Sequence, residues 1–152
     1  MRKKEREITD LSEIEGIIQK AKVCRVAFVD GTGPYIVPVN FGYERGALYV
    51  HGADAGHKIE ILKKNNRVCF EMDEDVEIRS AEKACKFSLK YRSVIGTGKV
   101  RFLERDEEKA RALDVIMKHY SDRDFTFSKP DLDSVLVWKV EIESMSGKKA
   151  GY

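Results

Sequence analysis

The sequence contains few cysteines, and none of them is arranged to bind a metal. Its 152 residues include three, Cys24, Cys69 and Cys85, with no Cys-x-x-Cys pair and no two histidines at metal-ligand spacing. An odd number of widely spaced cysteines is not a disulfide framework. Cys24 and Cys69 lie within apolar strand-like patterns, which favours buried thiols. We therefore expect neither a disulfide nor a metal site.

Long apolar runs and an excess of one charge are also missing. No hydrophobic stretch is long enough to span a membrane, and residues 1–7 lack the apolar core of a signal peptide. The 28 basic and 26 acidic residues leave a formal net charge of +2, so no overall field attracts nucleic acid or an anionic membrane. We expect a cytoplasmic protein that binds neither nucleic acid nor membranes and recognises anions only at a local site.

The remaining composition is that of a globular chain, with 42% hydrophobic and 36% charged residues. A chain of this length is expected to form one domain, residues 1–152, that buries a core without disulfides or metals. Helical spacing of apolar residues predicts helices over residues 8–21, 57–62 and 106–120. Alternating or apolar runs predict strands over residues 23–29, 34–43, 47–51, 67–73, 90–103 and 134–143.

The segments between these elements predict how the strands connect. The Asp-Gly-Thr-Gly run at residues 30–33 predicts a hairpin turn, and residues 121–133 form a connection. Residues 76–87 have no steady period and are expected to be a loop or an irregular insert. Gly96 and Gly98 lie within a strand, where glycines permit a bend or the close approach of another backbone. Short strands joined mostly by hairpins, with a few helices at the sides, predict an antiparallel barrel.

Residues 46–62 join a strand to a helix through a glycine-bearing loop. The loop between His51 and His57 is Gly-Ala-Asp-Ala-Gly, which has little side chain and free backbone dihedrals. A helix starting here has unpaired N–H groups and a positive dipole end beside His57 and Lys58. The segment predicts an anion site. An ordinary strand-to-helix turn is an equally good interpretation, because the regular glycine spacing of a P-loop is absent.

Pro38 interrupts the strand predicted over residues 34–43. Proline cannot donate to a ladder, so Pro38 indicates a sheet edge, a bulge, or a place where the sheet opens to something else. One face of this strand carries Tyr35, Val37, Val39, Phe41 and Tyr43, and the other carries Ile36, Pro38, Asn40 and Gly42. A bulge is one explanation, and a flat ligand lying against exposed backbone is the other.

Five motifs in a fixed order now resemble a known family. They are Cys-Arg-Val-Ala-Phe-Val at 24–29, Pro-Tyr-Ile-Val-Pro-Val-Asn-Phe at 34–41, Leu-Tyr-Val-His-Gly-x-x-x-Gly-His-Lys at 48–58, Asn-Arg-Val-Cys-Phe at 66–70, and Tyr-Arg-Ser-Val-Ile-Gly-x-Gly at 91–98. Together they resemble the pyridoxamine 5'-phosphate oxidase-like FMN-binding split barrels, and most closely the nitroimidazole-resistance (Nim-type) branch. The resemblance covers nearly all of the chain after the first predicted helix.

The resemblance implies a mainly β fold with flanking helices, a six-stranded antiparallel split β-barrel. It implies a homodimer with one FMN in each of two grooves at the subunit interface. Family members hold the flavin ring against the strand matching Tyr35, Ile36, Val37, Pro38, Val39 and Asn40. The positions matching Val50 and His51 line the cofactor, those matching His57 and Lys58 bind its phosphate, and the one matching Ser93 contacts the ring or ribityl chain. The position of Trp138 matches, loosely, an aromatic that reaches the cofactor of the neighbouring subunit.

The sequence departs from the oxidases at two places. The first phosphate-binding position is His57 where the oxidases commonly have arginine, which could make affinity depend on pH. The Arg-x-His substrate element near the oxidase C-terminus is missing, since the chain has Met-Ser-Gly-Lys-Lys at 145–149. We therefore do not expect oxidation of pyridoxamine phosphate.

His51 is the candidate catalytic residue, because it matches the active-site histidine of the Nim-type branch. A histidine near neutral pH can pass protons, but a structural histidine that caps its loop is an equal alternative. The first functional hypothesis is an FMN-dependent oxidoreductase that reduces nitroaromatic or other small electron-poor compounds. The second is a flavin-binding protein without catalysis, and the third is a haem-handling relative with His51 or His57 as axial ligand. His119 is expected to be structural or solvated, while core positions are favoured for Phe41 and Tyr91.

Overall fold

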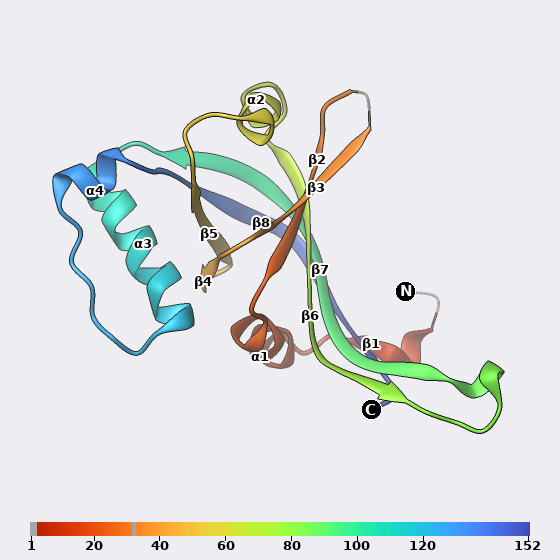
Figure 1. Cartoon of the computed structure of the whole chain (residues 1–152). Coiled ribbons are helices and arrows are strands. Elements are labelled where there is room, and N and C mark those ends of the chain that lie inside the picture. Colours follow the sequence, from red (N-terminus) through yellow and green to blue (C-terminus); the bar gives the residue numbers. More distant parts are fainter. Residues whose placement is uncertain (1–2, 32) are drawn as a thin grey trace.

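The computed structural model describes residues 3–31 and 33–152, which form one strongly curved antiparallel sheet with helices along its margins (Figure 1). The strands are β1 Glu7–Ile8, β2 Cys24–Val29, β3 Pro34–Val39, β4 Gly42–Glu44, β5 Ala47–Gly52, β6 Arg67–Arg79, β7 Ser88–Leu103 and β8 Leu136–Ala150. The α-helices are α1 Leu11–Lys20, α2 His57–Lys64, α3 Asp106–Tyr120 and α4 Lys129–Asp133, and the short 3-10 helices are η1 Lys4–Arg6 and η2 Ala84–Lys86.

The sheet order explains why this is a split barrel. The strands run β3-β2-β6-β7-β8-β5-β4, and β1 pairs with β8. The two ends of this path, β3 and β4, are joined by only two residues, Asn40 and Phe41, so the sheet must curl until its ends meet. β3 and β4 do not pair with each other within the described sheet, which leaves the barrel split there. The predicted fold class is confirmed, and the short strands β1 and β4 bring the described sheet to eight strands.

The main core fills the concave face of the sheet. Alternate residues of β2 and β6 point inward and are fully buried, as the period of a strand requires. The largest of the fully buried side chains are Trp138, Phe28, Phe41 and Phe70. A second, smaller core lies between α3 and the outer face of β7 and β8, and it includes Leu103, Leu113, Ile116, Leu132 and Val137.

The glycines of β7 allow neighbouring strands to approach closely, as predicted. A Cβ atom at Gly96 would lie 2.3 Å from the Phe70 ring, and one at Gly98 would lie 2.4 Å from the Glu141 carbonyl oxygen. Both distances are shorter than any Cβ contact allows, so only glycine fits at these two points. The β7–β8 register also shifts between Thr97 and Gly98, which adds to the local bend.

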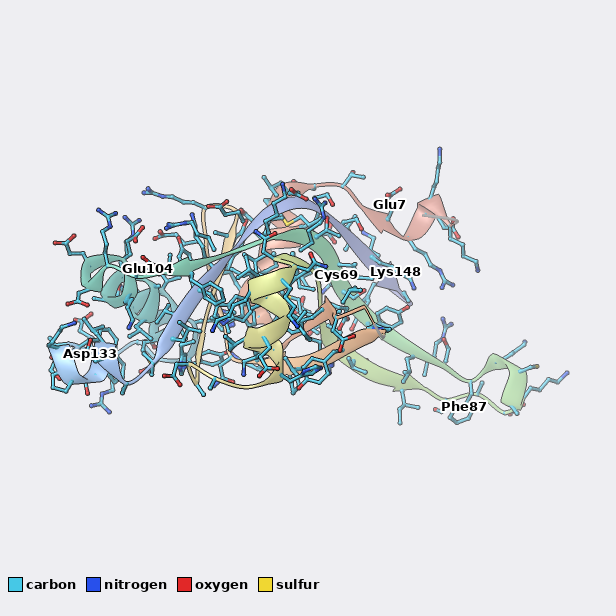
Figure 2. The ribbon with its side chains drawn as sticks, turned by 90° about the horizontal axis from the view of Figure 1, so that it is seen from above. Glu7, Cys69, Phe87, Glu104, Asp133 and Lys148 are labelled. Carbon is cyan, nitrogen blue, oxygen red and sulfur yellow. The ribbon has the colours of Figure 1, made fainter. Side chains whose placement is uncertain are left out.

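Residues 76–87, expected as a loop or irregular insert, form a projecting hairpin. β6 continues to Arg79 and pairs with β7 from Ser88, and η2 lies at the tip. The arm extends away from the barrel, with Phe87 near its end (Figure 2). Its large apolar side chains, Val76, Ile78, Phe87 and Leu89, are all exposed. Neither face of the arm is buried in the single chain, so its sequence shows no regular alternation of apolar and polar residues that would predict strands.

Several other boundaries differ for identifiable reasons. The first helix starts at Leu11, because the Asp10 carboxylate accepts a hydrogen bond from the Ser12 amide and caps it. The predicted strand over residues 34–43 breaks at Asn40–Phe41, where the Phe41 amide donates to the Tyr120 hydroxyl. The last strand begins at Leu136 and continues to Ala150, because β7 pairs with it throughout.

The cysteines only partly follow the prediction. Cys24 is buried, and burial raises the pKa of its thiol to about 12. Cys69 is exposed, because it lies on the outer face of β6 between the inward-pointing Val68 and Phe70. The predicted burial of Cys69 is therefore wrong for the single chain. Thr32, in the predicted hairpin turn, lies outside the described residues, but β2 and β3 pair as that hairpin requires. In the part of the chain that the structure describes, no helix has the length and apolarity to cross a membrane.

Candidate functional site

The N-terminus of α2 begins directly after the glycine-bearing loop. Gly56 is its N-cap with φ 115° and ψ 170°, a conformation that glycine adopts and side chains resist. The amides of Ile59 and Glu60 bond to the Gly56 carbonyl at 2.9 and 3.2 Å. The preceding amides, those of His57 and Lys58, have no acceptor within a helix by its geometry. The positive end of the helix dipole therefore faces the loop, which suits an anion.

His57 contacts the β2–β3 hairpin. Its ring lies edge-on to Tyr35, with 4.8 Å between centroids and 71° between the planes. Its Nε2 lies 3.1 Å from an Asp30 carboxylate oxygen, an ion pair when the imidazole is protonated. The Asp30 side chain is only 18% exposed. Asp30 therefore orients the histidine that stands where the oxidases commonly have arginine, a role that nothing in the sequence pattern suggested.

Lys58 points to a different neighbour. A Cβ atom at Gly52 would lie 3.7 Å from the Lys58 amino nitrogen, so the amine lies beside the end of β5. Because side chains alternate along a strand, this is the face of β5 opposite to the His51 side chain. The first two side chains of α2 thus reach two separate elements, Tyr35 on β3 and the end of β5. The structure brings the predicted phosphate-binding residues, the predicted ring-binding strand and the end of β5 to one junction, but it does not bring the His51 side chain into contact with Lys58.

β3 is an edge strand, and its regular pairing excludes one of the two explanations of Pro38, a bulge. It pairs only with β2 among the described strands. The β2–β3 register runs without a shift from Cys24–Val39 to Val29–Pro34, so Pro38 marks an edge and not a bulge. Tyr35, Val37 and Val39 pack against the core. Ile36, Pro38 and Asn40 point outward and are exposed. The outer edge of β3 leaves backbone groups open to a ligand.

Val50 and His51 point to opposite faces of β5. Val50 is 1% exposed within the barrel core, so in the single chain neither its side chain nor its backbone is open to a ligand. His51 is exposed on the outer face. It lies opposite Val137 on β8, at the edge of the core beneath α3.

Ser93 lies in a separate cavity of about 360 Å³ on the outer face of β6 and β7. Its walls include Tyr91, Lys148, Val76, Leu89 and Ile95. The Lys148 amine donates to the Tyr91 hydroxyl, so the predicted core position of Tyr91 is wrong. The predicted contact residues fall into two clusters, one around α2 and one around Ser93, and a single chain does not place both around one cavity.

Trp138 is fully buried in the barrel core, opposite Val50 on β5 and Phe102 on β7. Its indole nitrogen is a buried donor for which the described residues provide no acceptor. A side chain without exposed surface cannot touch a ligand of another subunit. The burial therefore argues against the predicted cofactor contact of Trp138.

Comparison with known proteins places this geometry in a family. The family model for pyridoxamine 5'-phosphate oxidase matches residues 10–149. The chain belongs to this family. No curated protein matches it in sequence.

One solved family structure is similar in sequence as well as in fold. It comes from Bacteroides thetaiotaomicron and is provisionally named a 5-nitroimidazole antibiotic resistance protein. It is 42% identical to this chain, with a TM-score of 0.85 over 94% of this chain and 86% of that one.

Two more distant structures share the fold alone. The flavocytochrome Anf3 of Azotobacter vinelandii is 19% identical, with a TM-score of 0.82 over 96% of this chain and 70% of that one. The FAD and heme binding protein of Mycobacterium smegmatis is 16% identical, with a TM-score of 0.86 over 97% and 74%.

Two residues at the end of α3 fix the link that ends β3 in this oxidase-family chain, and one of them, Tyr120, escaped the sequence interpretation. The Tyr120 hydroxyl accepts from the Phe41 amide at 3.0 Å and donates to the Lys22 carbonyl at 3.1 Å. His119 Nε2 lies 2.7 Å from the Ala21 carbonyl oxygen, and its ring packs on Phe41. The end of α3 thus holds the short link that terminates β3. His119 is structural, one of the two roles expected, whereas the tie of Tyr120 spans 79 residues and leaves no local signal.

Proposed function

We propose that this family member is an FMN-dependent oxidoreductase that reduces small electron-poor compounds, nitroaromatics among them. The observation that carries the proposal is the junction at the start of α2, where His57 contacts Tyr35 on the edge strand β3 and the Lys58 amine lies beside the end of β5. The 42% identity to the Bacteroides thetaiotaomicron protein named for 5-nitroimidazole resistance supports the substrate class. The missing Arg-x-His element argues against pyridoxamine phosphate as substrate.

The residues at this junction fit the phosphate of a flavin mononucleotide. A phosphomonoester carries nearly two negative charges and three strong acceptor oxygens. The Lys58 amine, the first-turn amides of α2 and a protonated His57 are the donors that such a group prefers. The Asp30 carboxylate, 3.1 Å from the His57 Nε2, holds the imidazole ring in place beside the start of α2.

The edge of β3 fits the planar part of the same ligand. Pro38 has no amide hydrogen to offer a neighbouring strand, and Ile36 is 60% exposed beside it. A flat ring lying here would meet backbone groups and apolar surface together. The bound flavin would supply the redox chemistry, while the protein supplies position, local charge and exclusion of water.

His51 is the residue we assign to proton transfer. It is exposed near the end of β5, on the outer face of the strand, whereas the Lys58 amine lies by Gly52 on the other face. A protonated imidazole at that point can deliver a proton to the compound being reduced. The alternative, a histidine that only caps its loop, predicts unchanged turnover when the imidazole is removed.

We further propose that the functional unit is a homodimer in the cytoplasm. The cluster around α2 and the cavity of Ser93 lie apart in one chain, and a second copy can bring one against the other. Ile36, Ile95 and Leu89 are 60%, 51% and 48% exposed near these two surfaces, and such apolar surface favours a protein cover. The groove would then be completed by Ser93, Tyr91 and Lys148 of the other copy.

The decisive experiment identifies the cofactor and then tests turnover. The purified protein should show flavin absorption bands, and mass spectrometry of the released ligand should give FMN and not FAD. After anaerobic reduction, nitroaromatic acceptors should reoxidise the protein faster than they oxidise free reduced FMN. A Soret band would replace the proposal with a haem-handling protein, and bound FMN without turnover would leave a flavin-binding protein.

A further inference from the structure

A cavity of about 390 Å³ lies on the outer face of β4, β5, β7 and β8 beside the start of α3. Ala47, Tyr49 and Leu103 line its base. Glu104, next to the start of α3, lies at the opposite end of the molecule from the hairpin tip at Phe87 (Figure 2). The cavity shares no lining residue with the cavity of Ser93 or with the one that contains His57.

This cavity concentrates positive charge. Its lining contains five cationic side chains and two carboxylates: Arg45, Arg101, Arg105, Arg111 and Lys139 against Glu44 and Glu108. Adding Glu141, which pairs with Lys139 at 2.7 Å, still leaves an excess of two cations. The cavity is therefore a local positive site on a chain whose 28 basic and 26 acidic residues nearly balance.

Other cavities on the described surface have no such excess. The cavity of Ser93 has Lys148 against Glu71 and Asp73. The cavity between the end of α1 and β6 balances three cations with three carboxylates. The cavity of His57 has one lysine, Lys64, against Asp30 and Glu60. A lining with more cations than carboxylates thus distinguishes the cavity beside α3 from these three.

The strand register places the cations beside an aromatic ring. Arg101 on β7 lies opposite Lys139 on β8, and Lys139 lies opposite Tyr49 on β5. Neighbouring strands are about 4.8 Å apart, so the three side chains stand in a row across the sheet. They share the outer face, because alternate residues of each strand point inward to the core.

The carboxylates in the cavity do not close it to another anion. Arg101 pairs with Glu108 at 3.0 Å, and Arg111 pairs with Glu44 at 2.8 Å. Glu141 pairs with both proposed phosphate ligands, with Lys139 at 2.7 Å and with Arg101 at 3.7 Å. The arginine side chains are 46% and 62% exposed and that of Glu141 is 53% exposed, and ion pairs this exposed are weak. A phosphate carries more negative charge than one carboxylate and accepts hydrogen bonds from several donors at once. It can therefore replace these carboxylates as the partner of the guanidinium groups.

We propose that this cavity binds a mononucleotide, with the phosphate between Arg101 and Lys139 and the base against Tyr49. A planar base stacks on tyrosine and arginine, and arginine and lysine are the usual partners of phosphate. The volume falls in the range of small-ligand sites. The site is distinct from the flavin site and does not depend on the proposed reaction.

Calorimetric titration of the full chain, saturated with FMN, with adenosine 5'-monophosphate tests the site. The expected result is saturable binding of one nucleotide per chain, tighter than that of adenosine or inorganic phosphate alone. Arg101→Gln and Lys139→Gln should each weaken binding roughly tenfold or more, because each removes a charge-assisted contact. Lys99→Gln is the matched control, since Lys99 is on the same face of β7, two residues earlier, and its side chain is 50% exposed. It should leave affinity within about twofold.

Three results would overturn the proposal. They are the absence of saturation at millimolar nucleotide, an equal loss of affinity in Lys99→Gln, and release of the bound FMN as the nucleotide binds. The last result would place the nucleotide in the flavin site. If the protein does not bind FMN, the flavin proposal fails, but a titration without FMN should still show the same nucleotide binding.

Discussion

Lys58 tests the phosphate site at the scale of one residue. Its amine lies beside Gly52 and has no part in the His57–Asp30 contact. We expect Lys58→Ala to weaken FMN binding by roughly tenfold to a hundredfold, since a charge-assisted hydrogen bond contributes about 1.5–3 kcal/mol. Fluorescence titration measures this, with Lys63→Ala at the exposed end of α2 as the control. Riboflavin lacks the phosphate, so an equal loss of riboflavin affinity would show that the assignment is wrong.

His51 separates catalysis from cofactor binding. His51→Ala should retain FMN but turn over about a hundredfold to ten-thousandfold more slowly, the usual contribution of a positioned proton donor. Steady-state rates measured on flavin-saturated protein provide the test. A variant with the wild-type rate would make His51 a structural cap of its loop.

At the scale of elements, β4 and α3 touch through their backbones. A Cβ atom at Gly42 would lie 2.5 Å from the Val115 carbonyl oxygen, whereas one at Gly16 on α1 would meet nothing within 4 Å. We expect Gly42→Ala to cost about 1–3 kcal/mol of unfolding free energy, as overpacking does. Gly16→Ala should stabilise by about 0.5–1 kcal/mol, because alanine is the better helix former. Denaturant unfolding of both variants checks the pair. If both substitutions changed the free energy of unfolding equally, the close contact between the β4 and α3 backbones would not contribute to stability.

The contact between the end of α3 and the end of α1 should depend on pH. Burial lowers the pKa of His119, and its hydrogen bond to the Ala21 carbonyl only partly offsets this. The folded-state pKa is therefore below the unfolded value, so the unfolded chain binds more protons below about pH 6.5. The stability contribution is complete above that pH and is lost as pH falls. Between about pH 7.5 and 5.5 the wild-type melting temperature should fall more than that of His119→Gln. Parallel curves would exclude this contribution.

Helices and strands with one face buried in the core were predictable from the spacing of their apolar residues. Elements whose apolar residues are exposed in the single chain were not. α3 has the predicted limits, Asp106–Tyr120, because its apolar face packs on the second core. The hairpin beyond Val76 exposes its apolar residues, so no local period announced it. Cys69 follows the strand period but faces outward. At the candidate site, the glycine-bearing loop predicted the start of α2 correctly. The His57–Asp30 contact was not predictable, because it joins residues 27 apart in sequence and no local pattern indicates it.

At the scale of the whole molecule, the proposed dimer can be tested on the outer face of the barrel. Ile95 is 51% exposed there, between Glu71 on β6 and Ser146 on β8. If a second copy covers this face, Ile95→Lys should dissociate the dimer while sparing the fold, since the new amine faces the Glu71 carboxylate. Leu11→Lys is the matched control, because Leu11 is 53% exposed on α1. Analytical ultracentrifugation should give a dimer for wild type and Leu11→Lys and a monomer for Ile95→Lys. The monomer should also lose FMN, since the groove needs Ser93 from the other copy. A wild-type monomer that binds FMN would refute both the dimer and the shared groove.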